Sequence, residues 1–168
     1  MILVVMGVSG VGKTTVGKIL SQQTGWPFYD ADDFHPPENV AKMRSGIALT
    51  DADRWPWLDR LNALLRDADQ RGQSAVLACS ALKQKYRDRL ARELREIRWV
   101  HLEGSFELIK ARLDARQGHY MTAQLLQSQF AALEPPINAL RIEVTGDPAT
   151  MARDILATLP APRPGLPT

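Results

Sequence analysis

Short apolar segments alternate with longer segments of helical periodicity along most of the chain. The five apolar segments have the length of strands buried inside a sheet, and they cover residues 2–6, 26–29, 74–79, 97–102 and 140–144. Helical segments cover residues 13–24, 37–45, 53–72, a basic stretch from 83, 105–116, 119–130 and 149–159. This alternation predicts an α/β fold in which a five-stranded parallel sheet is flanked by helices.

One helical segment has a particularly clear apolar stripe. We expect this helix to begin at Asp53, whose side chain can cap the N-terminus. Pro56 then falls in the first turn, where a missing N–H is tolerated, and Gly72 ends the helix. The stripe is assigned to the core and consists of Trp57, Leu58, Leu61, Leu64 and Leu65.

Length and composition indicate one globular domain. The 168 residues, 45% hydrophobic and 24% charged, exclude a collagen-like, disordered or coiled-coil chain. We assign residues 1–159 to this domain and the proline-rich residues 160–168 to a disordered tail. No apolar run approaches the ~20 residues of a membrane span, and the run 1–8 continues into a glycine-rich loop and not into a signal-peptide cleavage site.

Charge and cysteine content restrict the possible partners. A formal charge of +2 lacks the basic excess of nucleic-acid binders, and the basic stretch 83–98 also carries three acidic residues, as a solvated helix face does. Cys79 is alone, so neither an internal disulfide nor a cysteine zinc cluster can form. We therefore expect a cytoplasmic protein that binds no membrane and no nucleic acid.

A phosphate-binding motif lies between the first strand and the first helix. Residues 7–14 match G-x-x-x-x-G-K-[ST], in which glycines let backbone N–H groups turn toward phosphate oxygens. Lys13 places a cation near the β- and γ-phosphates, and the Thr14 hydroxyl can bind Mg²⁺. The predicted ATP-binding residues are Gly7, Val8, Ser9, Gly10, Val11, Gly12, Lys13, Thr14 and Thr15. The motif predicts a P-loop NTPase fold in three layers, and its context disfavours a chance glycine-rich turn.

Two other classes of P-loop protein fit the sequence poorly. The guanine-reading N-K-x-D tetrapeptide of GTPases is absent, since Asn39, Asn62 and Asn138 are followed by Val, Ala and Ala. Mechanical and nucleic-acid ATPases usually carry an acidic residue at the end of a later strand, where this chain has Cys79 and Ser80.

Two aspartates follow the second strand. Asp30 and Asp32 are expected on the same side of the strand end, at the edge of the sheet where the phosphate loop also lies. One carboxylate can hold the water shell of Mg²⁺, and we assign this role to Asp30; the other, Asp32, can take the proton of an acceptor hydroxyl. A polar loop with an Asx turn is the alternative. His35 is a candidate both for a substrate contact and for a structural hydrogen bond.

The phosphate loop is shared by many unrelated enzymes, whereas three further blocks of sequence, taken together, are specific to one family. They cover residues 51–58, 79–87 and 128–136, and shorter matches lie at 30–32, 35–36, 42–43, 46, 49–50, 112–116 and 118–119. On these residues the chain resembles the bacterial gluconate kinases of the shikimate-kinase-like branch of P-loop kinases, over residues 2–159. Ala31 and Tyr120 depart from the family pattern, at positions that are not catalytic.

The resemblance implies transfer of the ATP γ-phosphoryl group to the 6-hydroxyl of D-gluconate. Candidate contacts to the acceptor are Asp32, His35, Arg54, Lys83 and Arg87, the last two one helical turn apart, although they could also form an ordinary surface helix start. Kinases of another small hydroxy acid such as shikimate, and P-loop proteins that are not kinases, remain as alternatives.

The resemblance also implies a mobile lid over ATP, at about residues 117–138. Arg112 and Arg116 lead into it, Arg116 as a catalytic candidate and Arg112 as an ATP contact, although an exposed helix pair is the alternative. The loop 145–148 is expected beside the adenine. Members of the family are often homodimers.

Overall fold

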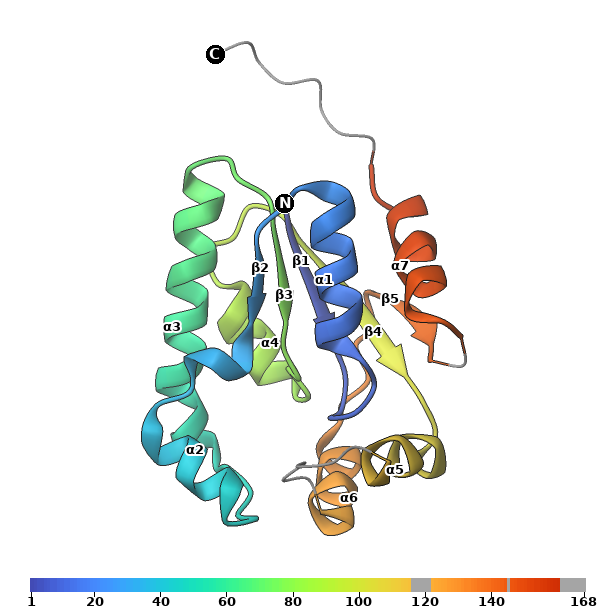
Figure 1. The fold of residues 1–168 in the computed structure, drawn as a ribbon. Helices are drawn as coiled ribbons and strands as arrows, with labels where there is room; N and C mark the ends of the chain where they lie inside the picture. The colour runs from blue at the N-terminus through green and yellow to red at the C-terminus, as the bar shows by residue number, and fades with distance from the viewer. Residues whose placement is uncertain (116–121, 145, 161–168) are drawn as a thin grey trace.

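The computed structural model describes residues 1–115, 122–144 and 146–160. Five parallel strands form one sheet in the order β2-β3-β1-β4-β5, which confirms the predicted α/β fold (Figure 1). The strands are β1 (Ile2–Met6), β2 (Phe28–Asp30), β3 (Ala75–Ala78), β4 (Ile97–Glu103) and β5 (Ala139–Glu143).

Helices cover both faces of the sheet because successive strand residues point to opposite faces. In β1, Leu3 and Val5 join the core beneath α1 and α7, whereas Ile2, Val4 and Met6 join the core beneath α3 and α4 (Figure 1). The helices are α1 (Lys13–Thr24), α2 (Pro37–Arg44), α3 (Asp51–Gln70), α4 (Gln84–Ala91), α5 (Phe106–Asp114), α6 (Ala123–Ala132) and α7 (Pro148–Ala157), with a 3-10 turn, η1 (Ala31–Phe34).

The start of α3 differs from the prediction. Thr50 caps this helix, and Asp53 is its third residue, in a capping box that joins the two residues reciprocally. Asp53 therefore does not cap the helix, and Pro56 lies inside it instead of in the first turn. The error arose because Thr50 and Asp53 are both good caps, and the choice between them depends on the preceding loop.

The basic helix is shorter than the basic stretch from which it was predicted. The basic helix ends already at Ala91, and Glu93 follows with a left-handed φ of 63°, which a continuing helix cannot accommodate. Several predicted features fall outside the described part of the chain: the end of the helix 105–116, the start of the helix 119–130, the lid residues 117–121 and the tail residues 161–168.

Within the described part, no helix is long and apolar enough to cross a membrane.

The carboxyl ends of all strands lie at one edge of the sheet, at the bottom of Figure 1. The loop after β1 carries the phosphate motif, β2 runs directly into η1, and β3 leads to the segment before α4. Because β2, β3 and β1 are neighbours, these three segments come together at one place.

Candidate active site

The phosphate loop has a backbone that only glycine adopts easily. Gly10 and Gly12 have φ of 84° and 98°, in the left-handed region. A Cβ on Gly10 would also lie 2.8 Å from Cγ of Leu113 on α5, so this position is restricted by packing as well. Helix α1 starts immediately after Gly12, and its free N–H groups and positive dipole end therefore face the loop.

Lys13 lies across this loop. Its ammonium donates a hydrogen bond to the Val8 carbonyl at 2.9 Å. Burial lowers the pKa of Lys13, and the nearby carboxylates of Asp32 and Asp30 oppose that shift. An ammonium group in this position can bind phosphate oxygens, whose negative charge favours its protonated form.

Asp30 is joined to the phosphate loop through Thr14. The Thr14 hydroxyl donates to Asp30 Oδ2 at 2.7 Å, and Asp30 Oδ1 accepts from the Asp32 N–H at 3.1 Å and caps η1. A hydroxyl and a carboxylate held together suit Mg²⁺, which prefers oxygen ligands and usually keeps several waters. The described residues contain no group of three or more His, Cys, Asp or Glu that could hold a metal, so phosphate and water would complete the shell.

Asp32 lies in η1, where its carboxylate acts electrostatically on Lys13. Its side chain is 84% exposed, and His35 Nε2 lies 3.9 Å from its Oδ1. Surrounding protein displaces part of its water and raises the pKa of Asp32, while the Lys13 ammonium opposes the rise. Asp30 is thus engaged in the Asx turn that the sequence left as the alternative, and Asp32 is exposed. The roles of the two carboxylates with Mg²⁺ and with an acceptor hydroxyl stay predictions.

His35 is buried and its contacts define its protonation. The imidazole stacks on Trp57 with ring centres 4.1 Å apart, and Asn39 Nδ2 lies 3.3 Å from its Nδ1. The Asn39 amide also donates to the Asp53 carbonyl at 2.9 Å, which fixes the amide orientation and makes His35 Nδ1 an acceptor. Burial, together with Arg54, lowers the pKa of His35 to about 4. The ring is therefore neutral, with its proton on Nε2 toward Asp32.

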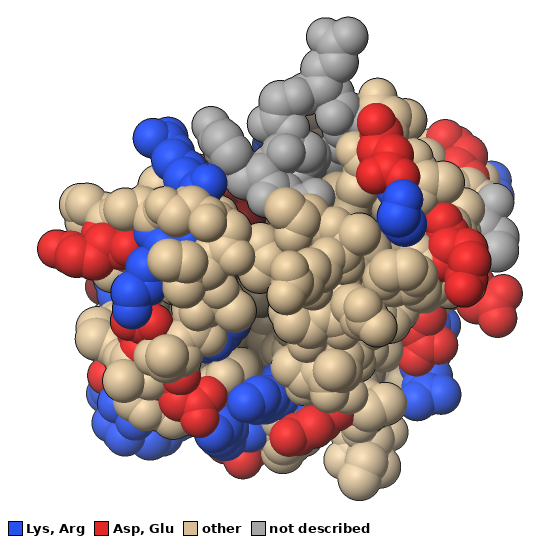
Figure 2. All heavy atoms as spheres, turned by 90° about the horizontal axis from the view of Figure 1, so that it is seen from below, with Lys and Arg blue, Asp and Glu red and all other residues tan. Residues whose placement is uncertain are grey.

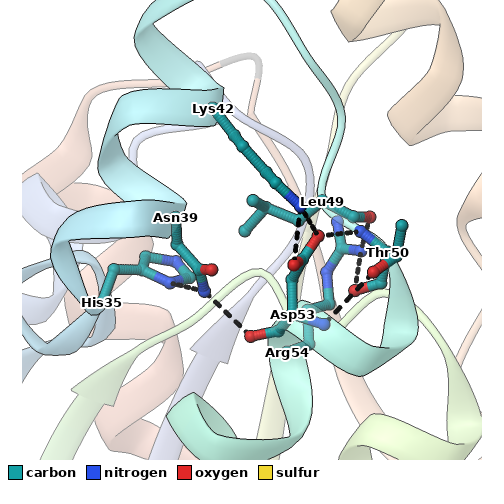
Figure 3. A network of polar contacts seen from close by, with 7 residues as sticks. All are labelled: His35, Asn39, Lys42, Leu49, Thr50, Asp53 and Arg54. Atoms are coloured by element: carbon teal, nitrogen blue, oxygen red, sulfur yellow. Dashed lines mark hydrogen bonds and ion pairs between the residues drawn. The ribbon is translucent and has the colours of Figure 1, made fainter.

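A polar network fastens α2 to the start of α3 (Figure 3). Lys42 forms two contacts to the Asp53 carboxylate, at 2.8 and 3.0 Å, and the Thr50 N–H donates to the same group at 2.8 Å. These bonds lower the pKa of Asp53 to about 2. Arg54 donates to the Leu49 carbonyl and, at 3.3 Å, to that of Thr50. The network thus fixes the segment that presents Arg54.

A cavity of about 340 Å³ opens between this segment and α6. Two of the candidate acceptor contacts, Arg54 and Lys83, line it, and each cation lies within 6 Å of the centre of the Tyr86 ring. Its other polar lining comes from Thr50, Asp51, Ser80, Ser128 and Gln129. Figure 2 views this edge of the molecule and shows a hollow with basic side chains at its lower end.

Arg87 does not line this cavity, contrary to the expectation that it faces the cleft together with Lys83. Its guanidinium is buried and donates to the carbonyls of Ala81 and Leu82, at 2.9 and 3.0 Å. Ala81 has a left-handed φ of 42°, so these bonds hold an unusual turn between β3 and α4. Arg87 therefore supports the loop that carries Lys83.

A second cavity, of about 320 Å³, lies on the other side of the phosphate loop. Its wall includes Thr15 and Arg112, and the Arg112 guanidinium donates to the Val144 carbonyl at 2.5 Å. Gly146 and Pro148 also line it, where the loop 145–148 was expected beside the adenine. Arg116, the other expected arginine, lies outside the described residues.

Several side chains of the first cavity received no role from the sequence, Asp51 and Gln129 among them. Asp51 accepts hydrogen bonds from Lys85 and Tyr86, lies 3.6 Å from Lys83 Nζ, and has its pKa lowered to about 2 by these groups. Gln129 contacts the phosphate loop. Asp51 belongs to the block 51–58 and Gln129 to the block 128–136, on which the family resemblance rests. Membership of these blocks is the sequence feature that could have pointed to both residues.

The fold and the phosphate loop, with two cavities beside it, define a class: the P-loop kinases. The family model described as "Shikimate kinase" matches residues 9–136. A probable gluconokinase of Rattus norvegicus is 52% identical over 154 residues, covering 80% of this chain and 83% of the relative. The gluconokinase of Gluconobacter oxydans is 51% identical over 134 residues, covering 80% and 75%.

Solved structures agree with these relatives. The crystal structure of a gluconokinase from Sinorhizobium meliloti has a TM-score of 0.83 and 42% identity, covering 92% of this chain and 89% of that one. A sugar kinase from Janibacter has a TM-score of 0.87 and 43% identity, covering 93% and 92%. The chain belongs to the gluconokinase family, within the shikimate-kinase-like P-loop kinases.

Proposed function

We propose that this protein transfers the γ-phosphoryl group of ATP to the 6-hydroxyl of D-gluconate, giving 6-phospho-D-gluconate and ADP. The observation that carries the proposal is the cavity lined by Arg54 and Lys83 next to the phosphate loop. Ser80 lines the cavity and its carbonyl accepts the Gly7 N–H at 3.4 Å, so the acceptor and nucleotide sites adjoin. Family membership supports the same acceptor.

The cavity suits a small polyol that carries one carboxylate. Arg54 and Lys83 provide positive charge beside the Tyr86 ring, where Asp51 pairs with Lys83 at 3.6 Å. The hydroxyls of Thr50, Ser80 and Ser128 provide hydrogen-bond partners. A gluconate whose carboxylate is held by the two cations can direct its 6-hydroxyl toward Asp32. His35, stacked on Trp57, lies 3.9 Å from the Asp32 carboxylate.

Phosphoryl transfer then requires three contributions from the chain. Asp32 accepts the hydroxyl proton as the new O–P bond forms, while the bond from the γ-phosphorus to the ADP oxygen breaks. Lys13 and the start of α1 stabilise the negative charge on the phosphates. Mg²⁺, held by Thr14 and through water by Asp30, supplies further neutralisation when it is bound.

We extend the proposal to the nucleotide side and to the setting. Arg112 binds ATP, and Arg116 acts as a catalytic residue that neutralises charge on the transferring phosphoryl group. Both lie in the segment that leads into the lid, about residues 117–138, whose closure excludes water. The protein acts in the cytoplasm on a small molecule, as a homodimer and without nucleic acid or membrane.

The decisive test measures ADP release from Mg-ATP with D-gluconate, shikimate, several sugar acids, nucleoside monophosphates and no acceptor. We expect strong turnover with gluconate alone, and a product with a phosphate ester at carbon 6 by ³¹P and ¹³C NMR. Lys13→Ala serves as the control for contaminating kinases. Turnover with shikimate and silence with gluconate would overturn the substrate while keeping the phosphoryl chemistry.

A further inference from the structure

Helix α6 makes a direct contact with the phosphate loop through one side chain. The Ser9 N–H donates to Gln129 Oε1 at 2.8 Å, and Gln129 Nε2 donates to Ser9 Oγ at 3.3 Å. Because a backbone N–H can only donate, its partner must be the carboxamide oxygen, and the two bonds therefore fix the orientation of the Gln129 carboxamide. The two residues are 120 positions apart in sequence, so tertiary packing alone brings them together.

The position of Gln129 is determined by packing on either side of it. Leu126 of α6 is completely buried in the core, and the Phe130 ring meets Phe106 of α5 edge to face, with centres 5.7 Å apart. Shortly after the helix, the Glu134 N–H donates to the Leu82 carbonyl at 2.9 Å. The Glu134 carboxylate accepts the first N–H of α4, from Gln84, at 2.6 Å.

The segment 129–134 therefore connects the phosphate loop with the loop that carries Lys83. Gln129 also lines the acceptor cavity, so its carboxamide lies on the boundary between the two sites. Ser9 is followed by Gly10 and precedes the first turn of α1, where the N–H groups that face phosphate begin. Rotation of the Ser9 peptide would alter the direction of those groups.

We propose that Gln129 is a positioning residue that holds the phosphate loop in its phosphoryl-transfer conformation and couples that conformation to the acceptor cavity. It acts through the Ser9 backbone N–H. The kinetic part of this inference rests on the proposed function, whereas the conformational part does not.

The first experiment is hydrogen exchange on the whole protein without ligands. Gln129→Met keeps the length of the side chain and removes both hydrogen bonds, and Gln127→Met is the matched control at an exposed position of the same helix. We expect the peptide that contains Ser9 to exchange roughly three- to tenfold faster in Gln129→Met, in line with the loss of one hydrogen bond, and unchanged in Gln127→Met. Equal exchange in the wild type and Gln129→Met would overturn the inference.

The second experiment is steady-state kinetics with Mg-ATP and gluconate. We expect Gln129→Met to lower kcat about tenfold and to raise KM for gluconate severalfold, with the Kd for Mg-ADP within twofold of wild type. Gln127→Met, at an exposed position of the same helix, should leave kcat and KM within twofold of wild type. Unchanged kcat and KM in Gln129→Met, or a loss as large in Gln127→Met, would overturn the coupling. Silence of the wild type on every acceptor would overturn the proposed function instead, and hydrogen exchange alone would then decide the role of Gln129.

Discussion

The division of labour between Asp30 and Asp32 can be tested with two substitutions of the same kind. Asp32→Asn keeps the size of the side chain and removes its capacity to accept a proton. Because the Asp32 carboxylate is 84% exposed and Asp30 keeps its contact with Thr14, we expect the fold and the phosphate loop to be retained. A positioned general base contributes about 10²–10⁴ in rate, so kcat should fall by that factor, or roughly 3–5 kcal/mol in activation free energy.

Asp30→Asn should behave differently. The amide oxygen of asparagine can still accept a hydrogen bond from the Asp32 N–H and cap η1, but the substitution removes the negative charge beside the Thr14 hydroxyl. We therefore expect the Mg²⁺ concentration for half-maximal rate to rise about tenfold, with a smaller loss of kcat at saturating Mg²⁺. In Asp32→Asn that concentration should stay within twofold of wild type.

The assay is ADP release at varied Mg²⁺, ATP and gluconate, with thermal unfolding of each variant as the control for folding. Retention of more than a tenth of wild-type kcat in Asp32→Asn would refute its assignment as the base. A tenfold shift of the Mg²⁺ requirement in Asp32→Asn and not in Asp30→Asn would show that the two roles are exchanged.

Three more predictions follow from individual side chains. Lys13→Ala should lose at least about a hundredfold in turnover with an unchanged circular dichroism spectrum, because its ammonium acts on the transferring phosphoryl group; near-normal turnover contradicts the phosphate-loop assignment. The pKa of His35 is lowered to about 4 in the folded protein, below its ordinary value near 6.5. Folding therefore favours the neutral ring, and the fold loses up to about 3 kcal/mol of stability as pH falls from 6.5 toward 4. In urea unfolding, His35→Phe, which keeps the stacking on Trp57, should therefore lose less stability between pH 7 and 4.5 than the wild type, and equal losses contradict the prediction. Lys83→Met should raise KM for gluconate at least tenfold with little change in stability. Arg87→Met should destabilise the fold by about 1–3 kcal/mol, since it removes this donor from the Ala81 carbonyl and leaves the Leu82 carbonyl with the Glu134 N–H; the reverse pattern in KM and thermal unfolding contradicts the placement of these residues.

The local features of the site could be predicted from the sequence. The phosphate loop is a contiguous motif whose residue types dictate its conformation, and its glycines do adopt left-handed angles. The first helix was predicted with its final bounds, Lys13–Thr24, because a glycine stands at both ends. Asp30 ends β2 and Asp32 lies in the turn that follows, so their position at the carboxyl edge of the sheet followed from the α/β alternation.

The arrangement of distant groups was decided by tertiary structure alone. Lys83 and Arg87 share a helix turn and a charge, yet one lines the acceptor cavity and the other is buried on the carbonyls of Ala81 and Leu82. Sequence spacing gives the face of a helix, but it does not give what packs against that face. The contact of Gln129 with Ser9, 120 positions apart in sequence, likewise depends on how α6 packs against α5. Local sequence therefore determined which chemical groups the protein has, and the packing of the helices determined which of them can act together.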